Sequence, residues 1–375
     1  MTKPLPEGWK EKTLGEVCEI ISGTTPDTKN PNYWNGDNYW ITPAELNEEN
    51  ILINDCRRKI TDLAVKDCSL RPMPKGTVIF SSRAPIGKVA ISDIDILYCN
   101  QGFKNFVCSK AIYNKFLYYF LKLNTSLLIK MGHGTTFKEI SKAVISKVQI
   151  FFPPLPEQRR IAAKLDKIFA DIDKAKEHTA KNLQNAKEVF LSTLRHLCKN
   201  TEKNWHRGRT DCFFVLQRGF DLPKHERTPG NYPLISSNGI TDYIDKFQVK
   251  APAVTTGRSG TIGKTHYSDM DFWPLNTTLF VKDFKGNYPK FVYYFLQTMN
   301  LEQYSSGTGV PTLNRNYVHE AIINFPPLKE QQIIAEELDK LWPKTQELEQ
   351  IYSKKLADLD ELKQSILQQA FSGKL

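Results

Sequence analysis

A sixteen-residue motif occurs twice in this chain. Residues 153–168 read PPLPEQRRIAAKLDKI and residues 326–341 read PPLKEQQIIAEELDKL, with ten identical positions at an offset of 173 residues. A second pair, KFLYYFLK at 115–122 and KFVYYFLQ at 290–297, shares six of eight positions at an offset of 175. The chain is therefore one structural unit encoded twice, in the order globular part, long helix, globular part, long helix.

The length of the chain and its duplication predict four segments. At 375 residues the chain exceeds the usual size of a single hydrophobic core. We expect a first domain in residues 1–154, a central long helix in 155–200, a second domain in 201–327 and a C-terminal long helix in 328–375. The predicted fold class is α+β, with two pseudo-repeated domains of mixed α/β structure joined by two long helices.

Composition excludes several classes of protein. Apolar residues make up 40% and charged residues 25%, as in ordinary globular proteins. The chain has no apolar run of about 18 residues, and its start is too polar for a secretory signal, so we expect a cytoplasmic protein without a membrane partner. Its seven cysteines form no CxxC pair, and its histidines lack HxH, HxxH and HxxxH spacing. We therefore expect reduced thiols and no metal.

The net charge of +10 lies mainly on three of the four segments. Residues 1–154 carry 20 basic against 15 acidic side chains, 155–200 carry 10 against 6, and 201–327 carry 14 against 11, whereas 328–375 carry 7 against 9. A basic surface of this kind suits a polyanion such as nucleic acid. Many proteins that bind no nucleic acid are equally basic, so charge alone leaves both possibilities open.

Both long helices carry a narrow apolar seam. Its steps of three and four residues, with paired fours at the same level in both helices, are typical of two helices that pack on each other. The alternative is a pair of amphipathic helices folded over a core. A Pro-Pro pair precedes each helix and fixes where it starts. In the second helix, Pro343 predicts a kink. Lys363 is the one residue of the second helix that interrupts the apolar seam. The seam residues that we assign to helix pairing are Ile161, Leu165, Ile168 and Ile172, and Ile334, Leu338, Leu341 and Leu348.

Each globular part is predicted to contain short strands followed by a helix. In the first, the strands are 77–81, 88–92 and 103–108, with a helix near 113–130; in the second they are 253–256 and 278–281, with a helix near 290–299. Each part has an Arg-bearing, Gly-containing loop, at 82–88 and 257–264, and an amide-rich step, Asn100-Gln101 and Asn276-Thr277.

These loops contain side chains that can read DNA. Arg and Lys bind guanine or phosphate, Asn and Gln can pair with adenine, and Gly allows close approach to a strand. The candidates are Arg83, Lys88, Asn100, Gln101, Arg258, Lys264 and Asn276. Alternatively, Arg83 and Arg258 only brace their loops through backbone carbonyls. Aromatic residues could also stack on nucleotides, although they more often belong to a core; the candidates are Trp34, Tyr39, Trp40 and Trp273.

No catalytic constellation is present in the sequence. The segment 257–265 has five residues between Gly257 and the Gly-Lys-Thr where a phosphate-binding loop needs four. The segment 30–33 reads NPNY rather than the NPPY of amino-methyltransferases, and no cofactor loop accompanies it. Pro26-Asp27 lacks the second half of a nuclease site. We therefore expect a protein that is not an enzyme.

Several motifs resemble the specificity subunit of type I restriction-modification systems. They are LPEGWKEKTLGEV at 5–17, SSRAPIGKVAI at 81–91, NQGF at 100–103, both PPLxEQ helix starts, and AFSGKL at 370–375. The likeness extends over essentially the whole chain. One departure concerns the second domain, which lacks a copy of the opening motif and keeps only Trp205 and Gly219 at the spacing of Trp9 and Gly23.

The resemblance implies two target-recognition domains, each reading one half of a bipartite double-stranded DNA site, held apart by two helices in an antiparallel coiled coil. It also implies two methyltransferase subunits that use S-adenosylmethionine and restriction subunits that use ATP and Mg. The chain itself would carry no cofactor, and its helices would serve as spacer and partner-binding elements. The competing class is a non-catalytic scaffold whose basic domains bind acidic proteins.

Overall fold

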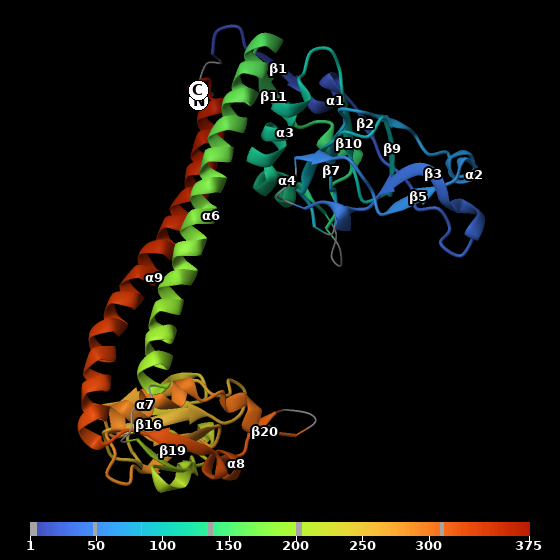
Figure 1. The fold of residues 1–375 in the computed structure, drawn as a ribbon. Coiled ribbons are helices and arrows are strands. Elements are labelled where there is room, and N and C mark those ends of the chain that lie inside the picture. The colour runs from blue at the N-terminus through green and yellow to red at the C-terminus, as the bar shows by residue number, and fades with distance from the viewer. Residues whose placement is uncertain (1–5, 48–50, 84, 134–137, 200–204, 308–310) are drawn as a thin grey trace. The chain divides into compact units, whose positions relative to one another are not determined.

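The computed structural model describes residues 6–47, 51–83, 85–133, 138–199, 205–307 and 311–375, and of residues 198 and 199 the backbone only (Figure 1). The chain forms two compact units. The first unit comprises residues 1–178 with 356–375, and the second comprises 179–355. Each unit thus contains one globular part together with adjoining stretches of both long helices.

The globular part of the first unit begins and ends on one antiparallel strand pair, β1 (Lys10–Thr13) with β11 (Gln149–Phe152). Between them lie two sheets. The first has the order β2-β10-β7-β8-β4, and the second has the order β5-β3-β9-β6. The bounds are β2 Cys18–Ile21, β3 Trp34–Ile41, β4 Leu52–Ile53, β5 Arg58–Ile60, β6 Met73–Pro74, β7 Val78–Phe80, β8 Val89–Ser92, β9 Ile96–Cys99 and β10 Asn105–Cys108.

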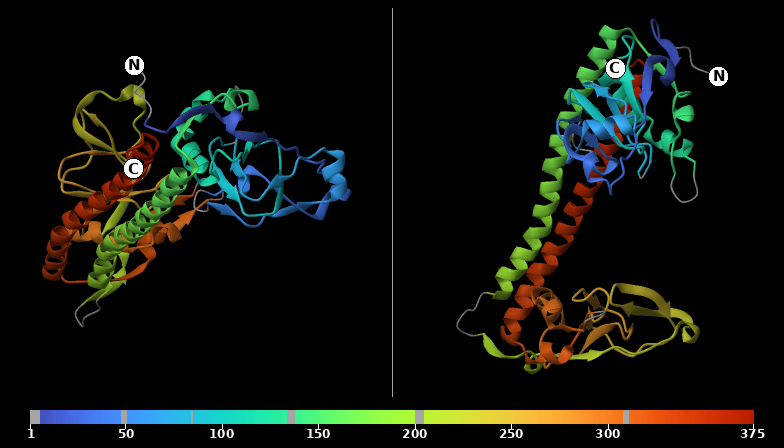
Figure 2. Two further views of the ribbon diagram at one scale, coloured as in Figure 1. Left: turned by 90° about the horizontal axis from the view of Figure 1, so that it is seen from above. Right: turned by 90° about the vertical axis from the view of Figure 1, so that its right-hand side faces the viewer.

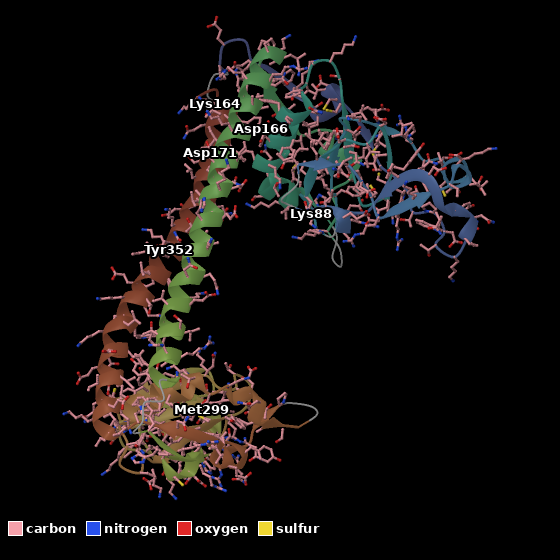
Figure 3. All side chains as sticks on the ribbon, viewed as in Figure 1. Lys88, Lys164, Asp166, Asp171, Met299 and Tyr352 are labelled. Carbon is pink, nitrogen blue, oxygen red and sulfur yellow. The ribbon has the colours of Figure 1, made fainter. Side chains whose placement is uncertain are left out.

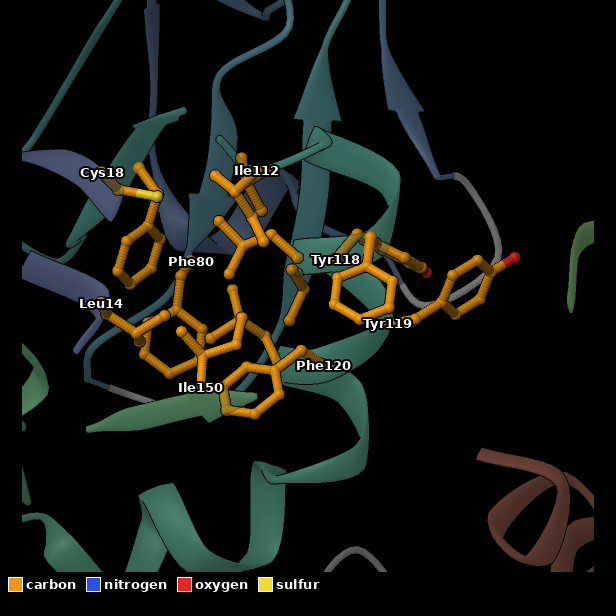
Figure 4. Close-up of a cluster of buried hydrophobic side chains, with 14 of the residues drawn as sticks. Leu14, Cys18, Phe80, Ile112, Tyr118, Tyr119, Phe120 and Ile150 are labelled. Atoms are coloured by element: carbon orange, nitrogen blue, oxygen red, sulfur yellow. The ribbon is translucent and has the colours of Figure 1, made fainter. Parts of the chain in front are cut away.

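The main core of the first unit lies between the five-stranded sheet and the helix α3 (Asn114–Leu123). Figure 4 shows Phe80 from β7 and Ile150 from β11 packed with Phe120 from α3, while the hydroxyl of Tyr119 points away from this cluster. Residues 116–121 of α3 are all buried, so this part of the helix is enclosed on every side rather than on one face. The other helices are α1 Leu14–Val17, α2 Asp62–Asp67, α4 Thr125–Met131 and α5 Lys142–Ile145.

The globular part of the second unit repeats this plan with smaller sheets. The strands β12 (His206–Arg209) and β22 (Ile322–Phe325) form the entry and exit pair. A four-stranded sheet has the order β13-β19-β16-β17, a three-stranded sheet the order β15-β14-β18, and β20 pairs with β21. The bounds are β13 Val215–Arg218, β14 Pro229–Ser236, β15 Gly239–Ile244, β16 Ala253–Gly257, β17 Thr265–Ser268, β18 Trp273–Pro274, β19 Thr278–Asp283, β20 Ser305–Ser306, β21 Thr312–Leu313, α7 Pro289–Thr298 and α8 Arg315–Glu320.

The predicted strands and helices of both domains are confirmed, with one difference. The helix expected near 113–130 is two helices, α3 and α4, because Asn124 leaves the helical conformation between them. Its side-chain Nδ2 donates to the carbonyl of Phe120 at 2.8 Å, and this local bond ends α3. The second sheet of each domain was not predicted.

The first strand of the second domain occupies the same place as that of the first. Lys10 lies opposite Phe152, and His206 lies opposite Phe325. Each domain then has a glycine where a side chain has no space. A Cβ at Gly23 would lie 1.6 Å from the carbonyl oxygen of Cys99, and one at Gly219 would lie 2.2 Å from that of Leu275. Gly23 and Gly219 are therefore matched because the backbone of another segment passes too close for any side chain at either position.

The two long helices are α6 (Leu155–Lys199) and α9 (Leu328–Phe371). Both begin directly after Pro-Pro, as predicted. In the first unit they run antiparallel, because Lys176 pairs with Asp360 at 2.7 Å while the earlier Asp173 pairs with the later Lys363 (Figure 2). Within the described residues, no helix is long and apolar enough to cross a membrane.

Most of the predicted seam is buried. Ile161, Leu165 and Ile172 on α6, and Ile334 and Leu338 on α9, are at most 6% exposed, and Ile168 and Leu341 are half-buried. The assignment of Leu348 to the seam is wrong, because its side chain is 40% exposed while Glu349 beside it is half-buried. Thr345, two residues after Pro343, is 2% exposed on the predicted seam, and Tyr352 further along is half-buried, so the difference is confined to the turn around Leu348.

The lysine that interrupts the seam has a specific partner. The Nζ atom of Lys363 forms an ion pair with Asp173 on α6 and lies 5.3 Å from the ring centroid of Phe169. The lysine stem fills the seam while its charge is neutralised at the edge. This interruption therefore fixes the helix register in the first unit.

Candidate nucleic-acid interface

In the first unit the Arg-bearing loop and the amide-rich step lie side by side. The loop connects β7 to β8, and the step follows β9. The backbone N–H of Ser82 donates to the carbonyl of Gly102 at 2.8 Å, which joins the two segments. The sequence thus identified two neighbouring segments, although Ala84 in the middle of the loop lies outside the described residues.

Arg83 lies beside a partly buried ion pair between Lys104 and Glu139. Lys104 on the segment before β10 is 6% exposed, and its Nζ lies 3.0 Å from Oε1 of Glu139 and 3.3 Å from Oγ of Ser82. The Nη1 atom of Arg83 lies 3.9 Å from the other oxygen of Glu139, and the Arg83 side chain remains 35% exposed. Two cations share one carboxylate here, so the loop keeps excess positive charge.

The other candidate side chains of the first unit hold backbone or neighbouring groups. Nζ of Lys88, labelled in Figure 3, donates to the carbonyl of Leu46 at 2.7 Å. Oδ1 of Asn100 accepts the N–H of Gly102 at 2.9 Å, and Oε1 of Gln101 accepts the hydroxyl of Thr25 at 2.7 Å. Lys88 and Asn100 therefore stabilise the loops, whereas the Gln101 side chain is exposed.

The second unit brings its predicted segments together in the same way. The backbone N–H of Arg258 donates to the carbonyl of Thr277 at 2.8 Å, and its Nη1 donates to that of Asn276 at 3.3 Å. Lys264 is exposed, and its Nζ donates to the carbonyl of Asn238 at 2.9 Å.

The hydrogen bonds show that the two arginines occupy different positions of the repeated loop. The carbonyl of Ser82 accepts the N–H of Ile140 at 3.0 Å, and the carbonyl of Arg258 accepts that of Leu313 at 2.8 Å. Ile140 and Leu313 are separated by the same 173 residues as the helix repeat. Arg258 therefore corresponds to Ser82, and Arg83 corresponds to Ser259.

The amide-rich steps are also shifted by one residue. Gln101 contacts Thr25, whereas Asn276 donates from Nδ2 to Oδ1 of Asp221. Thr25 and Asp221 lie two residues after the matched glycines Gly23 and Gly219. Asn276 therefore corresponds to Gln101 rather than to Asn100. The two domains present different side chains from one shared framework.

The four aromatic candidates divide into core and partly exposed residues. Trp40 and Trp273 are buried. Trp34 and Tyr39 are half-buried, and cations lie over their rings, Arg58 at 5.4 Å from Trp34 and Lys59 at 4.4 Å from Tyr39. Trp34 and Tyr39 are the two with accessible surface. Within the described part of the chain, no group of three His, Cys, Asp or Glu side chains could hold a metal ion.

Each long helix is attached to its domain by a buried glutamine, a role that was not predicted from the sequence. Oε1 of Gln158 accepts the N–H of Tyr113, the N-cap of α3, at 2.8 Å, and Nε2 donates to the carbonyl of Pro153 at 2.8 Å. Gln331 makes the equivalent bonds to Tyr288 and Pro326, both at 2.8 Å. In the sequence, this attachment is indicated by the glutamine that ends both copies of the PPLxEQ motif.

A second attachment follows two helical turns later. The hydroxyl of Tyr119 donates to Oδ1 of Asp166 at 2.6 Å, and Lys115 pairs with the other carboxylate oxygen at 2.6 Å (Asp166 is labelled in Figure 3). In the second unit, the hydroxyl of Tyr294 donates to Oδ1 of Asp339 at 2.5 Å in the same arrangement. Burial and the adjacent carboxylates raise the pKa of both tyrosines. The two repeated motifs therefore encode the joint between a domain and its helix.

Known specificity subunits are similar to this chain in sequence. The MjaIX specificity subunit of Methanocaldococcus jannaschii is 35% identical over 240 residues, which cover 59% of this chain and 55% of that relative, so the chain spans about half of its length. The EcoprrI specificity subunit of Escherichia coli is 24% identical over 350 residues, which cover 87% and 86%.

Two solved structures, both 20% identical to the chain, share its fold. One, from work on complex assembly and conformational transition of the type I R-M system, has a TM-score of 0.84 with full coverage of both chains. The HsdS subunit from Thermoanaerobacter tengcongensis has a TM-score of 0.62, with coverage of 100% of this chain and 99% of that chain.

A family model described as the type I restriction modification DNA specificity domain matches residues 6–182 and 203–357. These ranges include nearly all of both globular parts and the beginnings of both long helices. The chain therefore belongs to the family of type I restriction-modification DNA specificity proteins.

Proposed function

We propose that this chain directs a type I restriction-modification complex to its DNA target. Each domain reads one half of a bipartite site in double-stranded DNA, in the cytoplasm. The observation that carries the proposal is the repeated pair of loops, which present Arg83 and Gln101 in one unit and Arg258 and Asn276 in the other. Matched loop positions that carry different polar side chains suit two half-sites of different sequence.

The chain supplies recognition and no chemistry in this proposal. Two methyltransferase subunits with S-adenosylmethionine carry out methylation, and restriction subunits with ATP and Mg carry out cleavage. The helices α6 and α9 act as spacer and partner-binding elements. Their lengths of 45 and 44 residues support the spacer role, because a helix of this length extends roughly 65 Å at about 1.5 Å per residue.

DNA binding by the full chain tests the proposal against the scaffold alternative. Both globular parts carry excess basic residues, so binding to duplex DNA should release counterions and weaken by orders of magnitude between about 50 and 200 mM salt. Titration of labelled duplex with the chain, alone and with the methyltransferase subunits, measures this dependence. Absence of binding at low salt, or an affinity that is independent of salt, would contradict DNA recognition and favour a scaffold.

A further inference from the structure

Four polar side chains gather at one end of the sheets in the second unit. Arg218 ends β13, and its Nη2 lies 3.1 Å from Oδ2 of Asp221. Asp221 accepts a hydrogen bond from Nδ2 of Asn276 through its other oxygen. Arg258 donates from Nη1 to the carbonyl of the same Asn276 at 3.3 Å. These four residues, Arg218, Asp221, Arg258 and Asn276, form the second-unit arginine cluster.

The cluster has more positive than negative charge. Two guanidinium groups accompany one carboxylate, and Arg258 has no carboxylate within 4.0 Å in the described part of the chain. Burial, together with the nearby Arg218, lowers the pKa of Arg258. The side chains of Arg218 and Asp221 are 49% and 65% exposed. The cluster therefore offers N–H donors and uncompensated charge to a ligand from solvent.

The matched positions of the first unit carry no charge. Ser22 corresponds to Arg218, Thr25 to Asp221, Ser82 to Arg258 and Gln101 to Asn276, as the shared glycine spacing and the shared backbone hydrogen bonds show. The first unit has the same loop framework without the arginine cluster at these four positions. The cluster is therefore not a requirement of the fold.

Guanine fits this cluster better than the DNA backbone. Guanine presents two acceptors, O6 and N7, in the major groove, and arginine is their commonest partner. Every recognition domain must contact phosphates, so a phosphate site is expected in both units, whereas a base-reading site should differ between them. The cluster is present in the second unit alone among the matched positions.

We infer that Arg218 and Arg258 are a paired guanine-reading element of the second domain, and that Asp221 and Asn276 position them. This inference rests on the proposed function. One N–H of the Asn276 amide is bound to Asp221, which fixes the orientation of that amide beside Arg258.

Selection of bound sequences from a random duplex pool tests the inference. The full-length chain, assembled with the methyltransferase subunits of its complex, is compared with the variants Arg218→Ala and Arg258→Ala. Each variant should reduce the preference for guanine about tenfold or more at one position of the same half-site and leave the other half-site unchanged. Thermal melting of each variant checks that it is folded.

Arg209→Ala is the matched control. Arg209 is 51% exposed in the same unit and pairs with Asp211 at 2.8 Å, so its removal takes away the same charge from a similar ion pair. The control should lower affinity modestly while every base preference is retained. Asp221→Ala provides a second readout, because loss of the carboxylate should strengthen binding to unrelated duplex and weaken the guanine preference.

Two different outcomes separate the inference from the proposed function. If the wild-type complex selects two half-sites, but Arg218→Ala lowers affinity for all sequences as Arg209→Ala does, the cluster contacts phosphates and the inference is overturned. If the wild-type complex selects no split sequence, the proposed function fails and the inference fails with it.

Discussion

Gln158 and Gln331 make the same hydrogen bond in the two units. The Oε1 atom of each accepts the N–H at the N-cap of a domain helix, at 2.8 Å in both cases. Both side chains are at most 1% exposed. A rotation of a domain on its long helix would break this bond inside a closed core, where an unpaired polar group is costly. The two glutamines therefore fix how each domain is attached.

Gln331→Leu should destabilise the protein by roughly 1–3 kcal/mol, because the N–H of Tyr288 and the carbonyl of Pro326 lose a partner inside the protein. Gln332→Leu makes the same substitution at an exposed position of the same helix turn and should have little effect. Urea unfolding of both variants measures the difference. Equal stability of the two variants would contradict the assignment.

The tyrosine joints predict a loss of stability at alkaline pH. The pKa of Tyr294 is raised in the folded state, so the unfolded chain loses its proton first as the pH rises past about 10. The folded state then binds more protons than the unfolded state, and stability falls with increasing pH. Tyr294→Phe should reduce this fall, whereas Tyr243→Phe, at an exposed tyrosine of the same unit, should not. Melting temperatures between pH 8 and pH 11 measure both slopes, and parallel curves for the two variants would refute the prediction.

The ion pair beside Arg83 should respond asymmetrically to mutation. The second unit has Leu279 and Thr312 at the places of Lys104 and Glu139. Glu139→Thr leaves the charge of buried Lys104 without its partner and should cost about 1–3 kcal/mol. Lys104→Leu should cost less, because the Glu139 side chain is 38% exposed and can be hydrated.

The double variant, which copies the second unit, is the control for this pair. It should recover most of the stability lost in Glu139→Thr, as denaturant unfolding can show. A greater loss in Lys104→Leu than in Glu139→Thr would mean that packing around the lysine, rather than its charge, dominates.

The spacer role predicts that helix length controls the gap between half-sites. Four residues inserted after Thr179 in α6, with four inserted at the facing level of α9, should lengthen the gap by one or two base pairs. Four helical residues advance about 6 Å, and a base pair rises about 3.4 Å. The insertion also turns the following seam by about 40°, so some stability should be lost. An unchanged gap with both half-sites retained would show that the helices do not set it.

The sequence predicted the parts of this protein that local rules control. Repeated motifs and seam spacing identified α6 and α9, because Pro-Pro pairs and apolar periodicity act within a few turns of one helix. Leu348 was misplaced because Glu349 rather than Leu348 turns inward at this level, a choice that apolar periodicity does not contain.

The site was predicted less completely for a related reason. The sequence identified the correct loops, yet it did not show that Arg83 and Arg258 are one position apart in the repeat. That shift is visible only in the hydrogen bonds that join each loop to a distant strand. Arg218 and Asp221 escaped notice because Arg218 pairs with Asp221, and Asp221 in turn accepts a hydrogen bond from Asn276, 55 residues further along the chain.

The central claim is that each domain reads its own half of a split DNA target. Arg83→Ala in the full-length chain, assembled with its methyltransferase subunits, tests it most directly by selection from a random duplex pool. The wild-type complex should select two half-sites at a constant separation, and the variant should lose about 1–3 kcal/mol of discrimination in one half while the other half and the separation stay unchanged. Selection of a single continuous motif, or an equal loss in both halves, would contradict the claim.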